Sequence, residues 1–278
     1  MLVRKVSPFS VFTVLFSFLV VSLAFYLFLA HLLGASLPLM LTYSPPDMAV
    51  PADPAPEPHR CPATSSRLSP WLAPMMYGLG EKVVLPLYFS QINIVGQENI
   101  PASGPVVLSP THQSRWDPLL VGLLGKRIGR YLRFMVTADE CLGVQGWFIR
   151  RLGGFPVHVR KPSVKSLRHG VALLQEKEML VIYPEGDIYQ DGIHPLKPGL
   201  ARIALRAERS KPNLNVKVVP ISLEYSELCP KWRGTVTARI GKPISVIDYK
   251  QGVSKTQSKQ LTLDLQTALH QLADQATD

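Results

Sequence analysis

The pattern of apolar and polar residues divides the chain into three parts, of which the first is the most apolar. Residues 9–41 contain no Asp, Glu, Lys or Arg, and a helix needs ~20 apolar residues to cross a bilayer. A cleavable signal peptide is the competing interpretation, but its apolar region has only ~7–15 residues. We therefore expect residues 1–42 to form a single retained membrane anchor.

The second part, residues 43–74, has the composition of a linker. Seven prolines lie between residues 45 and 62, and proline lacks an amide donor and favours extended backbone. The apolar, aromatic stretch 71–88 follows. It is typical either of a helix at a membrane interface or of a core helix in the next domain.

The third part alternates short β-branched runs with amphipathic stretches. We predict strands at residues 92–95, 106–109, 133–136, 155–159, 179–183, 216–223 and 236–240. We predict helices at residues 118–131, 140–152, 164–177, 200–210 and 255–273. Such alternation indicates an α/β domain, here residues 75–278, with a largely parallel mixed sheet flanked by helices.

Composition and charge narrow the class of protein and its partners. The formal charge is +10 and 46% of the residues are hydrophobic, which excludes an intrinsically disordered chain. Residues 115–168 carry eleven basic and three acidic side chains, so an acidic partner is expected. Because no nucleic-acid-binding module is recognisable, and the chain has a predicted anchor, we favour an anionic lipid surface over nucleic acid.

Candidate chemistry appears directly after the predicted strand at 106–109, where His112 precedes Asp117 by five positions. A carboxylate on one imidazole nitrogen orients the ring and stabilises its charged form, so the pair is suited to general base catalysis. The structural alternatives are a histidine bonded to backbone and an Asp117–Pro118 helix start with Asp at the N-cap. Ser114 lacks the Gly-x-Ser-x-Gly context of a nucleophile, so the substrate must supply one.

The segment SPTHQSRWDP around this pair resembles the first motif of the glycerophospholipid acyltransferase family. The best-known members of that family are lysophosphatidic acid acyltransferases. Its three further motifs are matched in order by residues 154–160, by the Tyr-Pro-Glu-Gly run at 183–186 and by residues 218–221. The resemblance covers roughly residues 90–225.

The resemblance implies acyl transfer to the free hydroxyl of 1-acyl-glycerol-3-phosphate, in phospholipid synthesis. The donor is expected to be acyl-CoA or an acyl carrier protein thioester, with no metal and no cofactor besides this co-substrate. The implied general base is His112, with Asp117 as its partner. The expected substrate-binding residues are Arg115, Arg160, Glu185, Gly186 and Lys197.

Two departures from the family pattern concern the acceptor. Many members continue Glu-Gly with Thr-Arg-Ser, whereas this chain has Asp187, Ile188 and Tyr189, and Thr137 stands where many members carry Lys. Another lysophospholipid or lipid hydroxyl is therefore the alternative acceptor. A membrane-tethered binding module without catalysis and a lipid hydrolase are the alternatives from other classes.

The charges that flank the apolar stretch and the location of the acyl donor predict opposite membrane orientations. Arg4 and Lys5 precede the apolar stretch and acidic residues follow it, which indicates an N-terminus inside and a domain outside. Thioester donors are cytosolic, which requires the catalytic domain on the cytoplasmic face. We favour the second argument because two positive charges are a weak topology signal.

Overall fold

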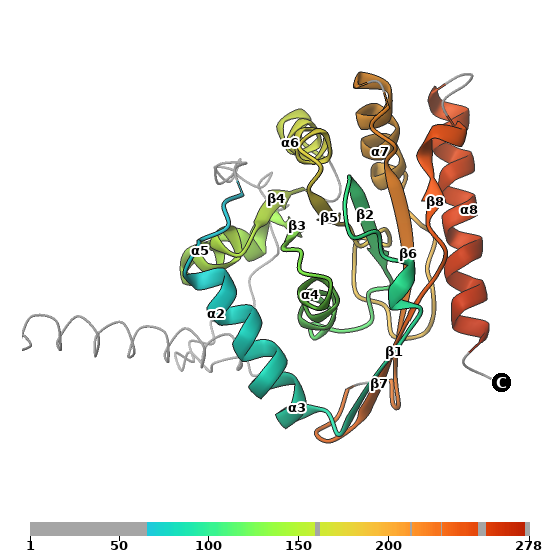
Figure 1. Ribbon diagram of the computed structural model, residues 1–278. Helices are drawn as coiled ribbons and strands as arrows, with labels where there is room; N and C mark the ends of the chain where they lie inside the picture. The colour runs from blue at the N-terminus through green and yellow to red at the C-terminus, as the bar shows by residue number, and fades with distance from the viewer. Residues whose placement is uncertain (1–65, 159–161, 212, 229, 250–253, 276–278) are drawn as a thin grey trace, which may run out of the picture.

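The computed structural model describes residues 66–158, 162–211, 213–228, 230–249 and 254–275 (Figure 1). The predicted anchor and most of the predicted linker lie outside these ranges. Within them, no helix combines the length and the apolar character needed to cross a bilayer.

The described residues form a mixed sheet of eight strands with the order β1-β7-β6-β2-β5-β3-β4, and β8 pairs with β6. The strands are β1 (Gln91–Val95), β2 (Val106–Pro110), β3 (Leu132–Thr137), β4 (Gly154–Val157), β5 (Met179–Val181), β6 (Lys217–Tyr225), β7 (Thr235–Ile240) and β8 (Ile244–Ser245). Only the β6–β7 and β6–β8 pairs are antiparallel. The predicted mixed, largely parallel sheet is thus confirmed, and two-residue β8 is the strand that the sequence pattern did not indicate.

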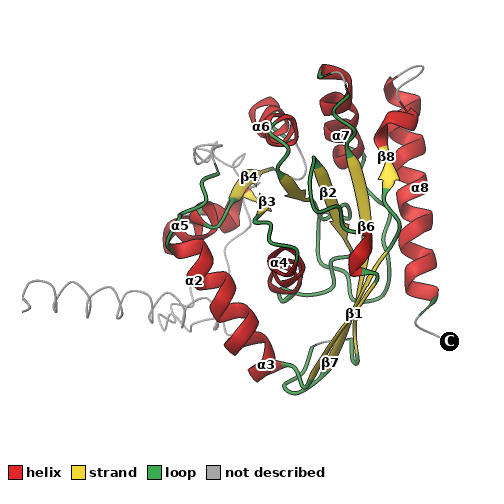
Figure 2. Ribbon diagram, in the orientation of Figure 1, coloured by secondary structure: helices red, strands yellow, loops and turns green. Residues whose placement is uncertain are grey.

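The five helices predicted after residue 91 are present, together with a helical segment before the sheet (Figure 2). The helices are α2 (Leu72–Leu79), α3 (Leu85–Tyr88), α4 (Asp117–Arg127), α5 (Gly143–Arg151), α6 (Val164–Gln175), α7 (Gly199–Ser210) and α8 (Ser254–Asp274). The helix predicted at 118–131 ends early because Gly129 adopts φ +73°, a conformation that terminates helices.

Helices cover both faces of the sheet (Figures 1 and 2). Val107, Leu180 and Val218 face a core shared with α6, α7 and α8. Leu108 and Val181 face the opposite core, to which α4 contributes. Because alternate residues of a strand point to opposite faces, the continuous apolar run of β2 fills both cores and places this strand in the centre of the sheet.

The α2–α3 segment packs on the outside of α4 and settles part of the ambiguity at residues 71–88. Leu85 and Tyr88 are buried against Trp116 and Leu120, as expected of a core helix, while Leu87 is 57% exposed. A π-helical turn (Gly80–Val84) joins the two helices. Pro86 accounts for this wider turn, because a proline in a helix lacks an N–H and its ring clashes with the carbonyl four residues earlier.

Residues 67–69, which the sequence places in the predicted linker, contact the end of α5. Leu68 forms a β-bridge with Leu152, and the backbone amides of Arg67 and Ser69 donate to the carbonyls of Arg150 and Arg151. The folded domain therefore includes residues 66–74, because their backbone groups find partners at the end of α5 rather than in solvent.

Candidate active site

The loop between β2 and α4 carries the predicted catalytic pair and is fastened to the neighbouring strand. The Thr111 amide donates to the Ile221 carbonyl at 2.9 Å. The Thr111 hydroxyl accepts from the Leu223 amide, also at 2.9 Å. These bonds fix the backbone one residue before His112, at the carboxyl end of a central parallel strand, where ligand sites of α/β sheets commonly lie.

His112 and Asp117 are in direct contact. The distance between His112 Nδ1 and Asp117 Oδ2 is 2.8 Å, and the Asp117 side chain is fully buried whereas that of His112 is 17% exposed. Because an ionised carboxylate only accepts hydrogen bonds, the proton of the neutral imidazole lies on Nδ1. Nε2 is then free to accept a proton, as a general base requires.

Asp117 does not cap its own helix, contrary to the N-cap alternative. The residue before it, Trp116, occupies the N-cap position, and its side chain makes no capping bond. The Asp117 carboxylate instead turns back, and Oδ2 accepts from the amides of Gln113 at 2.8 Å and Ser114 at 2.9 Å. The loop thus wraps around the carboxylate. Ser114 is buried and its hydroxyl accepts from the Trp116 amide.

Glu185 acts as a brace between two loops. Its side chain is 2% exposed, Oε2 accepts from the His112 amide at 2.8 Å, and Oε1 accepts from the His194 amide at 2.9 Å. Burial raises the pKa of this carboxyl, and the two amides partly oppose that change. Each oxygen thus accepts a hydrogen bond from a backbone amide, so Glu185 joins the two loops, and its contact with substrate stays a prediction.

The segment after Glu185 closes against the catalytic loop. Gly186 adopts φ +73°, which glycine tolerates best, and lets the chain turn back. The Tyr189 amide then donates to the His112 carbonyl at 2.8 Å, and the Lys197 amide donates to the Pro184 carbonyl at 2.8 Å. The motif thereby holds the backbone of His112 from both its amide and its carbonyl.

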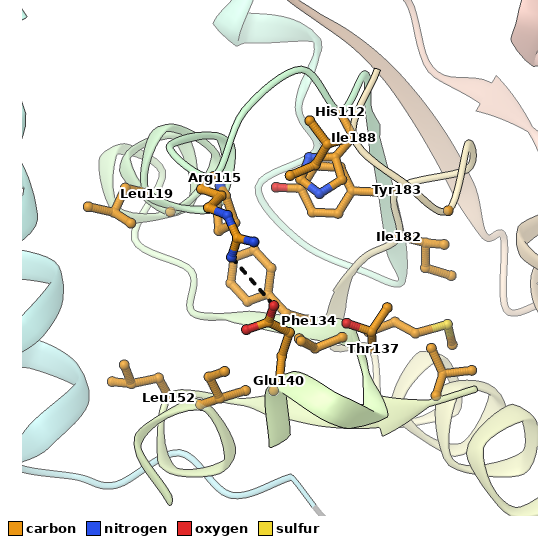
Figure 3. Close-up of a pocket in the computed structure, with 18 of the residues that line it drawn as sticks. His112, Arg115, Leu119, Phe134, Thr137, Glu140, Leu152, Ile182, Tyr183 and Ile188 are labelled. Carbon is orange, nitrogen blue, oxygen red and sulfur yellow. Dashed lines mark ion pairs between the residues drawn. The ribbon is translucent and has the colours of Figure 1, made fainter. Parts of the chain in front are cut away.

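A cavity of about 470 Å³ lies beside His112 and is lined mainly by apolar side chains (Figure 3). Its walls come from the α2–α3 segment, α4, β3, α5 and the segment between β5 and α7. The predicted residues His112, Arg115, Gly186 and Lys197 line it together. Arg115 Nη1 lies 3.5 Å from Glu140 Oε1 across the cavity. Arg160 lies in a part of the chain that the structure does not describe.

Two tyrosines of the site were not found from sequence. The Tyr183 ring stacks on the His112 ring with centroids 4.0 Å apart, and the Tyr225 hydroxyl donates to Asp117 Oδ1 at 2.5 Å. Burial, followed by the negative charge of Asp117, raises the pKa of both phenols well above 10. Tyr183 was visible only as the aromatic residue of its motif, and the predicted strand ended at residue 223, before Tyr225.

The described residues also contain no group of three or more His, Cys, Asp or Glu side chains placed to hold a metal ion.

Comparison with known proteins identifies the class of protein. A family model described as Acyltransferase matches residues 91–224, which span the predicted motifs from β1 to β6. The matched residues belong to this acyltransferase family, as the four motifs predicted, and together with the curated relatives they identify an acyltransferase.

The relatives it matches are more specifically named. The chain is 26% identical over 197 residues to the 1-acyl-sn-glycerol-3-phosphate acyltransferase of Bacillus subtilis, covering 69% of this chain and 92% of that protein. It is 24% identical over 151 residues to the enzyme of the same name from Streptococcus pneumoniae, covering 52% of each.

A solved structure supports the fold. The crystal structure of the 1-acyl-sn-glycerophosphate acyltransferase from Thermotoga maritima superposes with a TM-score of 0.56 at 18% identity. The superposition covers 74% of this chain and 80% of that one.

Proposed function

We propose that this chain is a membrane-bound O-acyltransferase that moves a fatty acyl group from an acyl thioester to the free hydroxyl of 1-acyl-glycerol-3-phosphate. The observation that carries the proposal is the His112–Asp117 pair at 2.8 Å beside a mainly apolar cavity. The names of the relatives from Bacillus subtilis and Streptococcus pneumoniae support this acceptor.

In the proposed reaction, His112 Nε2 takes the proton of the acceptor hydroxyl as its oxygen attacks the thioester carbonyl carbon. The tetrahedral intermediate then expels the thiolate, the carbon–sulfur bond breaks, and the imidazolium returns its proton to the sulfur. Asp117 stabilises the imidazolium between these two steps. A general base of this kind contributes ~10²–10⁴ in rate, and the thioester carbonyl is already activated.

The cavity suits the two parts of such substrates. Its apolar walls match acyl chains, and Arg115 and Lys197 supply positive charge for a phosphate. We keep Arg160 as a further phosphate ligand on the strength of the family resemblance alone. Gly186 lines the cavity, so its backbone can approach the acceptor closely.

The charges in the cavity also favour a second candidate acceptor. Glu81, Glu140 and Asp187 line it as well, and Arg115 is engaged by Glu140. A lysophospholipid whose headgroup carries less negative charge than a phosphate monoester encounters less repulsion there. This acceptor is the alternative within the same chemistry.

The proposal includes a location for the enzyme. Residues 1–42 would anchor the chain in the membrane, and the proline-rich segment would hold the catalytic domain at its surface. Because acyl-CoA and acyl carrier protein are cytosolic, we place the domain on the cytoplasmic face.

The first prediction is that His112→Ala lowers the rate of acyl transfer ~10²-fold or more. Membranes containing the full chain receive labelled acyl-CoA or acyl carrier protein thioester with 1-acyl-glycerol-3-phosphate or a panel of lysophospholipids. His270→Ala, at an exposed position of α8, is the matched control and should retain activity. Undiminished transfer by His112→Ala would refute the mechanism, and acyl release without acceptor would indicate a hydrolase.

A further inference from the structure

The buried carboxylate of Asp117 has partners on both oxygens. Oδ2 accepts from His112 Nδ1 and from two loop amides, whereas Oδ1 accepts from the Tyr225 hydroxyl at 2.5 Å. The Asp117 side chain is fully buried, so water cannot replace a missing donor. An unsatisfied buried charge is costly, which makes the donor on Oδ1 significant.

The backbone of Tyr225 is held by the sheet, and its side chain also hydrogen-bonds Ser114 of the catalytic loop. It is the last residue of β6 and pairs with Val236 of antiparallel β7. The parallel pairing of β6 with β2 already ends at Ile221, so the β6–β7 hairpin carries the phenol beyond β2. Its ring also lies near that of Phe89, with centroids 6.0 Å apart. The hydroxyl therefore approaches Asp117 from an element distant in sequence.

We infer that Tyr225 is a positioning residue that orients the Asp117 carboxylate and limits the negative charge acting on His112. This inference rests on the proposed function, in which His112 is the general base. A donor on Oδ1 fixes the rotation of the carboxylate, so that Oδ2 remains in line with Nδ1. The donor also spreads the carboxylate charge toward Oδ1 and away from the imidazole.

The charge on Asp117 Oδ2 determines in which direction Tyr225→Phe should move the pH dependence of catalysis. Without the Tyr225 hydroxyl, more negative charge remains at Oδ2, and the imidazolium form of His112 is stabilised. His112 then stays protonated, and inactive as a base, up to a higher pH. Burial and the charge of Asp117 hold the pKa of Tyr225 well above 10, so the phenol remains a donor throughout the assay range.

Other ionisable groups around His112 do not change in a Tyr225→Phe variant. Tyr183 stacks on the imidazole, and Glu185 binds its backbone amide. The remaining charged groups that share its cavity are Arg115, Glu140, Glu81, Asp187 and Lys197. Tyr225→Phe removes the bond to Asp117 and a side-chain bond to Ser114. Ser114 is uncharged, so a shift in the pH profile specific to Tyr225→Phe reports on the Asp117 contact.

The test is Tyr225→Phe in the full-length enzyme. We expect kcat to fall roughly tenfold, as for loss of one hydrogen bond to a charged group. KM for the acceptor should be unchanged, and the acidic limb of the kcat/KM profile should move to higher pH. In an Asp117→Asn background the same change should cost little further, because Tyr225 acts through the carboxylate.

Tyr249→Phe is the matched control. The Tyr249 hydroxyl donates to Asp264 Oδ2 at the same 2.5 Å, in the middle of α8, and neither residue lines the cavity. Its removal should affect stability but leave kcat and the pH profile unchanged. Equal kinetic effects of the two variants, or an unchanged pH profile in Tyr225→Phe, would overturn the inference.

A titration independent of acyl transfer separates this inference from the proposed function. The His112 imidazole can be followed by NMR in labelled full-length protein in detergent, with its signal assigned through His112→Ala. Tyr225→Phe should raise the pKa of His112 whichever lipid is the substrate. An unchanged His112 pKa refutes the positioning role, whereas failure of wild-type enzyme to acylate any lysolipid refutes the proposed function.

Discussion

Two buried carboxylates hold the backbone and side chain of His112, and they do so in different ways. Asp117 binds the imidazole and the amides that follow it, while Glu185 binds the amide of His112 itself. A carboxylate is suited to this task because it accepts several backbone N–H groups at once. The position of the base is therefore set by polar contacts in the interior and not by apolar packing alone.

At this scale we predict that Glu185→Gln changes how stability depends on pH. Burial raises the pKa of Glu185 in the folded chain above the unfolded value of ~4.3. Its contribution to the free energy of unfolding is thus fully present below the unfolded pKa and is lost as pH rises through the folded pKa. The variant cannot titrate, so its stability should fall less over this window.

The amide of the variant also replaces one acceptor oxygen by a donor. One of the bonds to His112 or His194 is then lost, at a cost of about 1–3 kcal/mol. Thermal unfolding in detergent across a pH series measures both effects. Parallel stability curves for wild type and variant would contradict the assignment of Glu185 as a buried, titrating brace.

Among the elements, α5 depends on close backbone contact with the turn before it. A Cβ added at Gly146 would lie 2.0 Å from the carbonyl carbon and oxygen of Cys141, far inside contact distance. The adjoining 3₁₀ turn (Ala138–Cys141) carries Glu140, which faces Arg115 across the cavity. The packing of α5 therefore determines one wall of the site.

We accordingly expect Gly146→Ala to destabilise the chain by about 1–3 kcal/mol, because the new methyl group forces backbone apart. Gly80→Ala is the comparison, since a Cβ there meets nothing within 4 Å and alanine favours helix by up to ~1 kcal/mol. Thermal unfolding of both variants checks this. If Gly146→Ala melted at the same temperature as Gly80→Ala, the packing of α5 would tolerate the added methyl group and the prediction would be wrong.

At the scale of the whole molecule, several of the basic side chains make hydrogen bonds and ion pairs within the domain. Arg130 donates to the carbonyls of Pro101, Gly104 and Lys177, and Arg133 pairs with Glu178 at 2.9 Å. These side chains connect loops and strands, so they contribute less to a lipid-binding face than the sequence count indicates. Charge alone therefore does not locate the surface that the proposed function places against the membrane.

Exposed apolar side chains indicate that surface more clearly. Trp71 precedes α2 and is 59% exposed, and Trp232 in the β6–β7 hairpin is 60% exposed. The hairpin and α3 are joined, because the Tyr88 hydroxyl donates to the Pro230 carbonyl at 2.8 Å. The hairpin and α3 meet at one end of the molecule, away from α6, whereas α2 begins beside α5, at the other end of the α2–α3 segment (Figure 1). Exposed tryptophans are typical of membrane interfaces.

In vesicles of brominated lipid, we predict that the emission of Trp71 and Trp232 is quenched. Removing either one by Trp→Phe substitution should lower the quenched fraction of the fluorescence. Trp116→Phe is the control, since Trp116 is 2% exposed and its loss should raise that fraction. If the quenched fraction were the same in all three variants, neither Trp71 nor Trp232 would lie at the membrane.

Local pattern accounts for most of the elements. The β2 stretch is a continuous apolar run and the α6 and α7 stretches are amphipathic, so the sequence predicts the positions of these elements within a few residues. The differences fall where backbone conformation overrides pattern. Gly129 ends α4 early, and backbone bonding draws residues 67–69 into the domain.

The sequence by itself determined the alternation of strands and helices, the four motifs and the pairing of His112 with Asp117. These features depend on neighbouring residues, whose separation along the chain limits how far apart they can lie. Only the tertiary structure decided that the Tyr225 hydroxyl donates to Asp117 and that Glu185 accepts from the His112 amide. It also decided that Arg115 lies opposite Glu140 across the cavity. Those contacts join residues whose proximity depends on strand order and helix packing, and no local pattern specifies that order.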